Sequence, residues 1–189
     1  GMPIVWLGRA LGGSFTERVT EADLLPAIAS AAARTGHRIF LLGAADGVAA
    51  EAARKLEARY PGLQIAGTLA PPVGFERDQM RLEEVLDRLR RSRTDILFVA
   101  LGAPRQEAFV RTHAEAAGVK VALAVGAAID MAAGRVTRAP VLMQRLGAEW
   151  LWRLVREPRR LGRRYLVEDA PFFLMAMREL WRSARGVRA

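Results

Sequence analysis

Cysteine is absent from this 189-residue chain, which excludes disulfides, a thiolate nucleophile and thiolate metal ligands. The two histidines, His37 and His113, are far apart in sequence, which argues against a histidine-based metal centre. No apolar run reaches the roughly 18 residues of a membrane-spanning helix, and the N-terminus lacks a secretory signal pattern. We therefore expect no transmembrane helix, no metal and no cofactor.

Several nucleotide and catalytic motifs are also missing. The segment 42–47 (LGAADG) contains glycines but not the G-x-G-x-x-G spacing, so we interpret it as a tight turn in which Asp46 caps the next helix. The chain has no Walker-type lysine and no G-x-S-x-G nucleophile elbow. It also has no D-x-D pair, a common set of metal–diphosphate ligands in sugar transferases.

The apolar content of 51% and the charged content of 26% are those of a globular protein. Strand-like and helix-like segments alternate along the chain. This alternation predicts an α/β fold: an open, mostly parallel, Rossmann-like sheet with helices on both faces. The predicted strands are 37–43, 63–68, 95–101 and 120–126, and the predicted helices between them are 48–60, 79–91 and 104–117.

Two helices are expected before the first strand. Residues 3–11 look helical, and Gly12, Gly13 and Ser14 end that pattern. A second helix begins after Thr20, which has Asp23 three residues later in a capping-box arrangement, and ends near Gly36.

The segment Asp95–Glu107 (DILFVALGAPRQE) predicts a buried strand, a turn and a helix start. Ligands of open α/β sheets bind at this end of the strands. The helix start offers amide and guanidinium donors suited to a phosphate. The alternative is a purely structural βα turn with polar surface residues.

A second turn, at Gly126–Asp130, places a carboxylate just beyond the last predicted strand, at the start of a short helix over 127–133. Asp130 could accept a hydrogen bond from a ribose or sugar hydroxyl, or could simply cap that helix. The long loop 69–78 follows the second predicted strand, where loops often carry function.

Positive charge is concentrated near the end of the chain. From Arg135 to Ala189 there are 13 arginines, no lysine and five acidic residues, so this segment accounts for +8 of the net charge of +9. It predicts three helices, over 140–156, 158–168 and 170–185, with aromatic residues between the arginines. We therefore divide the chain into an α/β domain, 1–134, and a basic helical appendage, 135–189.

Arginines beside aromatic rings suit an anionic membrane surface. Two alternatives stay open. The aromatic residues could be the packed faces of a helical subdomain, or the segment could bind nucleic acid by charge and stacking.

Taken together, these stretches resemble the WecG/TagA/CpsF family of bacterial glycosyltransferases over nearly the whole chain. The residues that carry the resemblance are Glu17-Arg18-Val19, Asp23-Leu24, 39–47, 58–68, 96–107, 125–130, Ala133-Gly134, Arg138-Ala139-Pro140, 144–150 and Arg164-Tyr165-Leu166.

The resemblance implies an inverting transferase that needs no metal. Its donor would be a UDP-linked N-acetylmannosamine-type sugar, and its acceptor an undecaprenyl-diphosphate-linked N-acetylglucosamine of cell-surface polysaccharide synthesis, such as teichoic acid. It also implies a cytoplasmic protein that is peripheral on the inner face of the bacterial cell membrane. The basic appendage would dock there and help to complete the active site. The apolar helix surfaces leave room for a homo-oligomer.

The resemblance also assigns roles to residues. Arg18 matches the family's active-site arginine, and Gln106 the glutamine of its G-x-P-x-Q-E motif. These two are the predicted catalytic residues. Arg18 and arginines of the appendage are expected to bind the diphosphate. The predicted substrate-binding residues are Gly102, Pro104, Gln106, Glu107, Gly126, Asp130, Arg156, Arg163 and Arg164.

One departure from the family pattern concerns the general base. The family places this aspartate in an Asp-Gly-x-Pro motif, and Gly1-Met2-Pro3 resembles only the last three residues of that motif. We accordingly expect little or no transferase activity from these 189 residues. A non-catalytic homologue that binds a UDP-sugar is the corresponding alternative function.

Overall fold

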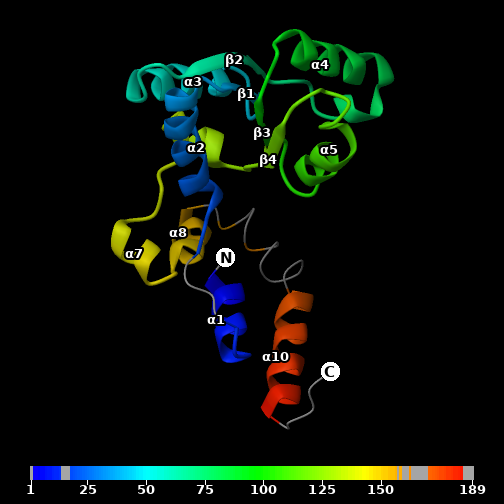
Figure 1. Cartoon of the computed structure of the whole chain (residues 1–189). Helices are drawn as coiled ribbons and strands as arrows, with labels where there is room; N and C mark the ends of the chain where they lie inside the picture. Colours follow the sequence, from blue (N-terminus) through cyan, green and yellow to red (C-terminus); the bar gives the residue numbers. More distant parts are fainter. Residues whose placement is uncertain (1, 14–17, 157, 159–161, 163–169, 185–189) are drawn as a thin grey trace. The chain divides into compact units, whose positions relative to one another are not determined.

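The fold is built on a four-stranded, all-parallel sheet with the strand order β2-β1-β3-β4 (Figure 1). The structure is a computed structural model that describes residues 2–13, 18–156, 158, 162 and 170–184. The strands are β1 (Arg38–Gly43), β2 (Gln64–Leu69), β3 (Ile96–Ala100) and β4 (Val121–Ala124). Because all four strands are parallel, their carboxyl ends meet at one edge of the sheet. This confirms the predicted α/β fold.

Helices cover both faces of the sheet because its strands are apolar on both sides. Ile39 and Leu41 of β1 pack on one face with α2 (Glu21–Thr35), α3 (Val48–Arg59) and α6 (Ala128–Ala132). Phe40 and Leu42 pack on the other with the 3-10 helix η1 (Phe75–Arg77), α4 (Gln79–Arg91) and α5 (Arg105–His113). The alternation along β1 therefore builds two separate apolar cores.

The expected boundaries of the early helices are mostly confirmed. The Thr20 side chain accepts a hydrogen bond from the Asp23 N–H at the start of α2, and Gly36 ends α2 with a positive φ of 72°. The predicted Asp46 cap is wrong. Gly47 occupies the N-cap position of α3, and Asp46 lies in the exposed turn before it.

Two later boundaries also differ from the expectation. α5 begins at Arg105 and ends at His113, four residues before the predicted end, and turns lead from there to Gly118 at φ 70°. Asp130 does not cap α6, because the N-cap position is Ala127 and Asp130 lies inside the helix. The structural alternative for Asp130 is therefore wrong.

A second group of helices comprises α1 (Met2–Ala10), α7 (Val141–Arg145), α8 (Glu149–Arg156) and α10 (Ala170–Ala184). The predicted helix over 140–156 is two helices, because the chain turns at Gly147 with φ 73°. The predicted helix over 158–168 lies outside the described residues. None of the described helices has both the length and the apolarity needed to cross a bilayer.

The chain divides into two units that are described separately. One is Thr20–Thr137 and contains the sheet; the other combines Gly1–Val19 with Arg138–Ala189. The N-terminal helix α1 is thus grouped with the basic segment. The division of function between residues 1–134 and 135–189 stays a prediction.

Candidate functional site

Gln106 joins the turns that follow two neighbouring strands. It sits in the first turn of α5, where its backbone N–H donates to the Gly102 carbonyl at 3.0 Å. Its buried side chain accepts a hydrogen bond at Oε1 from the Gly126 N–H, with a distance of 3.2 Å. Its Nε2 donates to Glu107 Oε1 at 2.9 Å. Four of the predicted site residues, Gly102, Gln106, Glu107 and Gly126, are therefore connected through the backbone and side chain of Gln106.

The turns themselves depend on glycine. Gly102 has a φ of 80° and Gly126 a φ of 47°, values that residues with a Cβ rarely adopt. A Cβ on Gly102 would meet no described atom within 4 Å, so the turn after β3 faces open space. The neighbouring strand end is tighter: Ala44 N–H donates to the Ala100 carbonyl at 2.9 Å, directly after Gly43.

Asp130 and Pro104 complete the predicted set at this edge. Asp130 lies on α6, four residues after Gly126, and its backbone carbonyl accepts the Arg135 N–H at 2.9 Å. Pro104 takes the N-cap position of α5, preceded by a cis peptide bond from Ala103. Glu107 is exposed in the first turn of α5, where the helix dipole favours a carboxylate.

A pocket of about 310 Å³ lies beside these turns, in the same unit. It is formed by the loop after β2 and one side of α5, and contains Glu76, Arg77, Arg105 and His113. Arg105 lies 3.8 Å from the Glu76 carboxylate and also donates to the Leu101 carbonyl. None of the predicted site residues lines the pocket, although Arg105 is the neighbour of Gln106. The hydrogen bonds at the strand ends therefore define the candidate site better than the pocket does.

The opposite edge of the sheet holds a structural carboxylate. Asp95 accepts hydrogen bonds from Lys120 Nζ at 2.7 Å and from the Arg38 N–H at 2.9 Å. The hydrogen bond from Lys120, followed by that from Arg38, lowers the pKa of Asp95 below its ordinary value. Asp95 thus ties together the amino ends of β1, β3 and β4, away from the strand ends that carry Gln106.

A clamp also fixes the chain that leaves α6. Glu51 of α3 pairs with Lys55 at 3.2 Å and with Arg135 at 2.9 Å, and these cations lower the pKa of Glu51. Lys55 in turn donates to the Ala133 carbonyl. The short helix that carries Asp130 is therefore held against α3.

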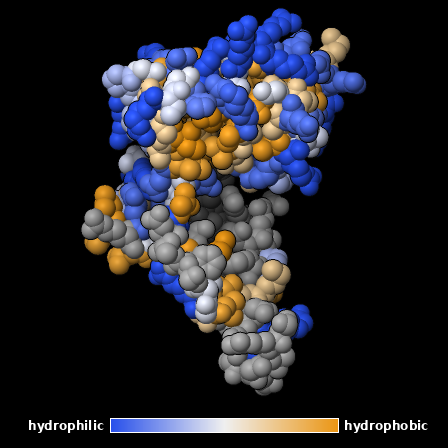
Figure 2. All heavy atoms as spheres, viewed as in Figure 1, coloured by the Kyte–Doolittle hydropathy of each residue, from blue (hydrophilic) through white to orange (hydrophobic). Residues whose placement is uncertain are grey.

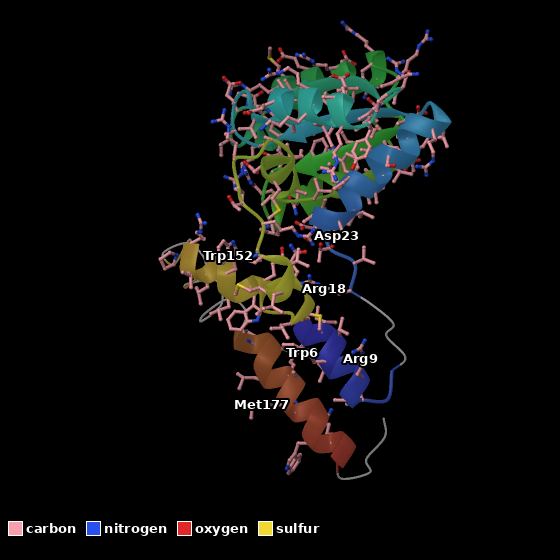
Figure 3. All side chains as sticks on the ribbon, turned by 90° about the vertical axis from the view of Figure 1, so that its left-hand side faces the viewer. Trp6, Arg9, Arg18, Asp23, Trp152 and Met177 are labelled. Carbon is pink, nitrogen blue, oxygen red and sulfur yellow. The ribbon has the colours of Figure 1, made fainter. Side chains whose placement is uncertain are left out.

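Arg18 belongs to the other unit and pairs with a buried carboxylate. Its Nη2 donates to Glu149 Oε2 at 3.0 Å. Arg18 is labelled in Figure 3. Arg138 approaches the other oxygen of Glu149, with Nε 3.5 Å from Oε1. Glu149 is only 4% exposed, so its carboxylate is buried in this unit.

The predicted arginines of the basic segment can be followed only in part. The Arg156 guanidinium lies 4.8 Å from the centre of the Trp152 ring, a cation–π contact on α8. Arg163 and Arg164 lie outside the described residues. Among the described residues, no group of three or more histidines, aspartates or glutamates could hold a metal ion.

An open parallel sheet with polar side chains and glycine turns at the carboxyl ends of its strands defines a ligand-binding α/β protein. The profile of the glycosyl transferase WecG/TagA/CpsF family matches residues 1–186. The chain belongs to this family, which confirms the resemblance noted in the sequence.

Two similar proteins carry the same name, N-acetylglucosaminyldiphosphoundecaprenol N-acetyl-beta-D-mannosaminyltransferase. The protein of Bacillus spizizenii is 33% identical over 163 residues, and that of Bacillus subtilis is 31% identical over the same length. Each match covers 86% of this chain and 61% of the relative. The chain thus spans less than two thirds of the length of either protein.

Sequence reasoning missed two polar features. Glu76 and its pocket fall in the loop 69–78, whose length marked it as functional without indicating which side chains matter. Glu149 lay within the stretch that carries the resemblance but received no role. Its partner Arg18 is 131 residues away, so no local pattern could have joined them.

Proposed function

We propose that the protein binds a UDP-sugar at the turns after β3 and β4 and serves transfer of an N-acetylmannosamine-type sugar. The acceptor is N-acetylglucosamine on a polyprenyl diphosphate. The observation that carries the proposal is buried Gln106, whose side-chain amide links Gly126 and Glu107 and whose backbone N–H donates to Gly102, at the ligand-binding edge of the sheet. The names of the two relatives support the sugar and the acceptor.

Each group has a chemical task in this proposal. The turn at Gly102, with the N–H groups at the start of α5, faces the diphosphate of the donor. Asp130 accepts a hydrogen bond from a ribose or sugar hydroxyl. Gln106 connects the two turns through its hydrogen bond with Gly126 and thereby sets the distance between these contacts.

Arginine rather than a metal balances the diphosphate charge in this proposal. The sequence has no D-x-D pair, and the family resemblance assigns Arg18 and arginines of the basic segment to a diphosphate. UDP affinity is therefore expected to be the same, within about twofold, in EDTA and in magnesium, because the proposed contacts need no cation bridge. A large gain in affinity with magnesium would contradict this part of the proposal.

The basic segment is proposed to dock on the inner face of the bacterial membrane, where the lipid acceptor resides. Apolar side chains are exposed on and beside α7: Val141 is 61% exposed, Leu142 69% and Leu146 64% (Figure 2). Arg156 beside Trp152 adds the pairing of a cation and an aromatic ring that suits the headgroup region. A homo-oligomer is compatible with the same surface.

Calorimetric titration with UDP tests the proposal without depending on turnover. We expect saturable 1:1 binding of UDP, weaker binding of uridine, and at least about tenfold loss of affinity in Gln106→Leu. Glu57→Gln, an exposed change on α3, is the control and should bind as the unchanged protein does. Absence of UDP binding together with salt-sensitive binding of single-stranded DNA would replace the proposal with the nucleic-acid alternative.

Turnover separates the two remaining outcomes. Transfer from UDP-N-acetylmannosamine to a lipid-linked acceptor supports the enzymatic function directly. UDP binding without transfer supports the non-catalytic homologue. The expectation of little turnover from these residues stays a prediction.

A further inference from the structure

A buried carboxylate orients two arginines in the unit formed by residues 1–19 and 138–189. Glu149 is the first residue of α8, and its two oxygens face different guanidinium groups, Oε2 that of Arg18 and Oε1 that of Arg138. A buried carboxylate needs such cationic partners because desolvation is costly. The three side chains together hold two positive charges and one negative charge.

The position of Glu149 is fixed by the packing before it. Gly147 turns the chain between α7 and α8, and a Cβ there would collide with Met2 and approach Trp6 of α1 (Figure 3). Gly147 therefore packs closely against α1, two residues before α8 begins. The start of a helix also favours a carboxylate through the helix dipole.

Arg18 depends on Glu149 for its direction. Within the described residues its guanidinium makes a single hydrogen bond, from Nη2 to Glu149, while its side chain is only 15% exposed. An arginine carries five N–H donors in a planar fork. This contact directs the guanidinium towards Glu149 and leaves further donors for a ligand.

We propose that Glu149 is a positioning residue that aligns Arg18 and Arg138 as a receptor for the diphosphate of a substrate. Two guanidinium groups on one carboxylate can reach two linked phosphates, which a single guanidinium cannot do as well. This rests on the proposed function, because it takes Arg18 as a substrate-binding group. It adds Arg138 as a second diphosphate ligand and Glu149 as the group that orients both.

The sign of the effect distinguishes positioning from simple charge. Removing a negative charge beside an anion site should strengthen anion binding if only Coulomb attraction matters. If Glu149 orients the arginines, Glu149→Gln should weaken binding although the site becomes more positive. A purely structural role would change stability and leave the affinity of the folded protein unaltered.

The experiment is calorimetric titration of the full chain with UDP, with farnesyl diphosphate as a short polyprenyl diphosphate, and with inorganic pyrophosphate. We expect Glu149→Gln to raise the Kd of at least one organic diphosphate by about tenfold. Glu149→Asp should restore much of the affinity, and the matched control Glu57→Gln should change nothing. Circular dichroism and melting curves confirm that each variant is folded.

A higher Kd of Glu149→Gln for UDP assigns the receptor to the donor, and a higher Kd for farnesyl diphosphate assigns it to the acceptor. Either result supports the inference. Unchanged or tighter binding by folded Glu149→Gln overturns it, while UDP binding that still depends on Gln106 leaves the proposed function standing. If no diphosphate binds the unchanged protein, both are wrong. Should Glu149→Gln fail to fold, Arg138→Gln decides, because unchanged affinity there also overturns the inference.

Discussion

Gln106 accepts the Gly126 backbone N–H at 3.2 Å, and this one hydrogen bond connects the turns after β3 and β4. Both turns leave the same edge of a parallel sheet, where ligands of such sheets bind. A buried amide can hold them together without adding charge. The candidate site is therefore organised by a neutral side chain placed between two glycine turns.

Replacing Gln106 by glutamate separates its acceptor role from its charge. The variant keeps an oxygen for Gly126 but places a carboxylate where Nε2 now donates to Glu107 at 2.9 Å. Two adjacent carboxylates repel each other and repel a diphosphate. We expect UDP affinity to fall about tenfold at pH 7 relative to the unchanged protein. Calorimetric titration of both proteins at this pH checks it, and equal affinities would contradict this reasoning.

Gly43 and Gly47 form a matched pair for the turn after β1. Both have positive φ, but a Cβ on Gly43 would collide with the Ala100 carbonyl, whereas a Cβ on Gly47 would meet nothing within 4 Å. Gly47→Ala should cost about 1 kcal/mol of unfolding free energy for the left-handed backbone. Gly43→Ala should cost at least about 3 kcal/mol, because strain and collision add. Urea unfolding measures both, and equal costs would refute the close approach of β1 and β3.

Helix capping provides a second matched pair. Asp78 accepts hydrogen bonds from the Met80 and Arg81 N–H groups, whereas Asp46 makes no capping bond to α3. Asp78→Ala should therefore lower stability by about 1 kcal/mol. Asp46→Ala should stay within about 0.5 kcal/mol of the unchanged protein. Thermal melts of the two variants check this. A larger loss of stability in Asp46→Ala would indicate that Asp46 caps α3, as the sequence predicted.

Asp95 should contribute a pH-dependent part of the stability. Its pKa is lowered in the folded state by Lys120 and by the Arg38 N–H. The folded state therefore binds fewer protons at this carboxyl than the unfolded state does. Its contribution is present above the unfolded pKa and is lost as pH falls through the folded pKa. We expect Asp95→Asn to cost about 1 kcal/mol at pH 7.

That cost should shrink as pH falls through the folded-state pKa of Asp95, because the aspartate then becomes protonated in the folded state. Urea unfolding of both proteins at a series of pH values from neutral downwards gives the difference directly. Asp46→Asn, at an exposed position, serves as the control. A cost that is independent of pH would mean that the ion pair with Lys120 does not stabilise the fold.

Local patterns predicted the sheet and most helix boundaries well. The helix Gln79–Arg91 was predicted with the bounds that the structure has, and the structure shows that Asp78 caps it. The cap of α3 was wrong since Gly47, at φ 72°, enters the helix directly and leaves Asp46 in the turn. This left-handed conformation follows a turn that is held close to the end of β3 by the hydrogen bond from Ala44 to Ala100. The local sequence does not reveal that contact.

The candidate site was predictable where it follows from topology. Gln106 and Gly126 come after adjacent parallel strands, so their proximity could be expected from the order of strands. The pairing of Arg18 with Glu149 could not, because the two residues are 131 positions apart in the sequence. Long-range pairs of this kind become visible only in three dimensions.

The most direct test of the central claim is a map of the UDP contact by nuclear magnetic resonance, recorded as amide spectra during a titration. We predict that the amide signals of Gly102, Gln106, Gly126 and Asp130 move together and saturate at one UDP concentration. A matching titration of Gln106→Leu should lose these shifts. Shifts confined to the pocket residues 73–77, or no shifts at all, would contradict a donor site at the ends of β3 and β4.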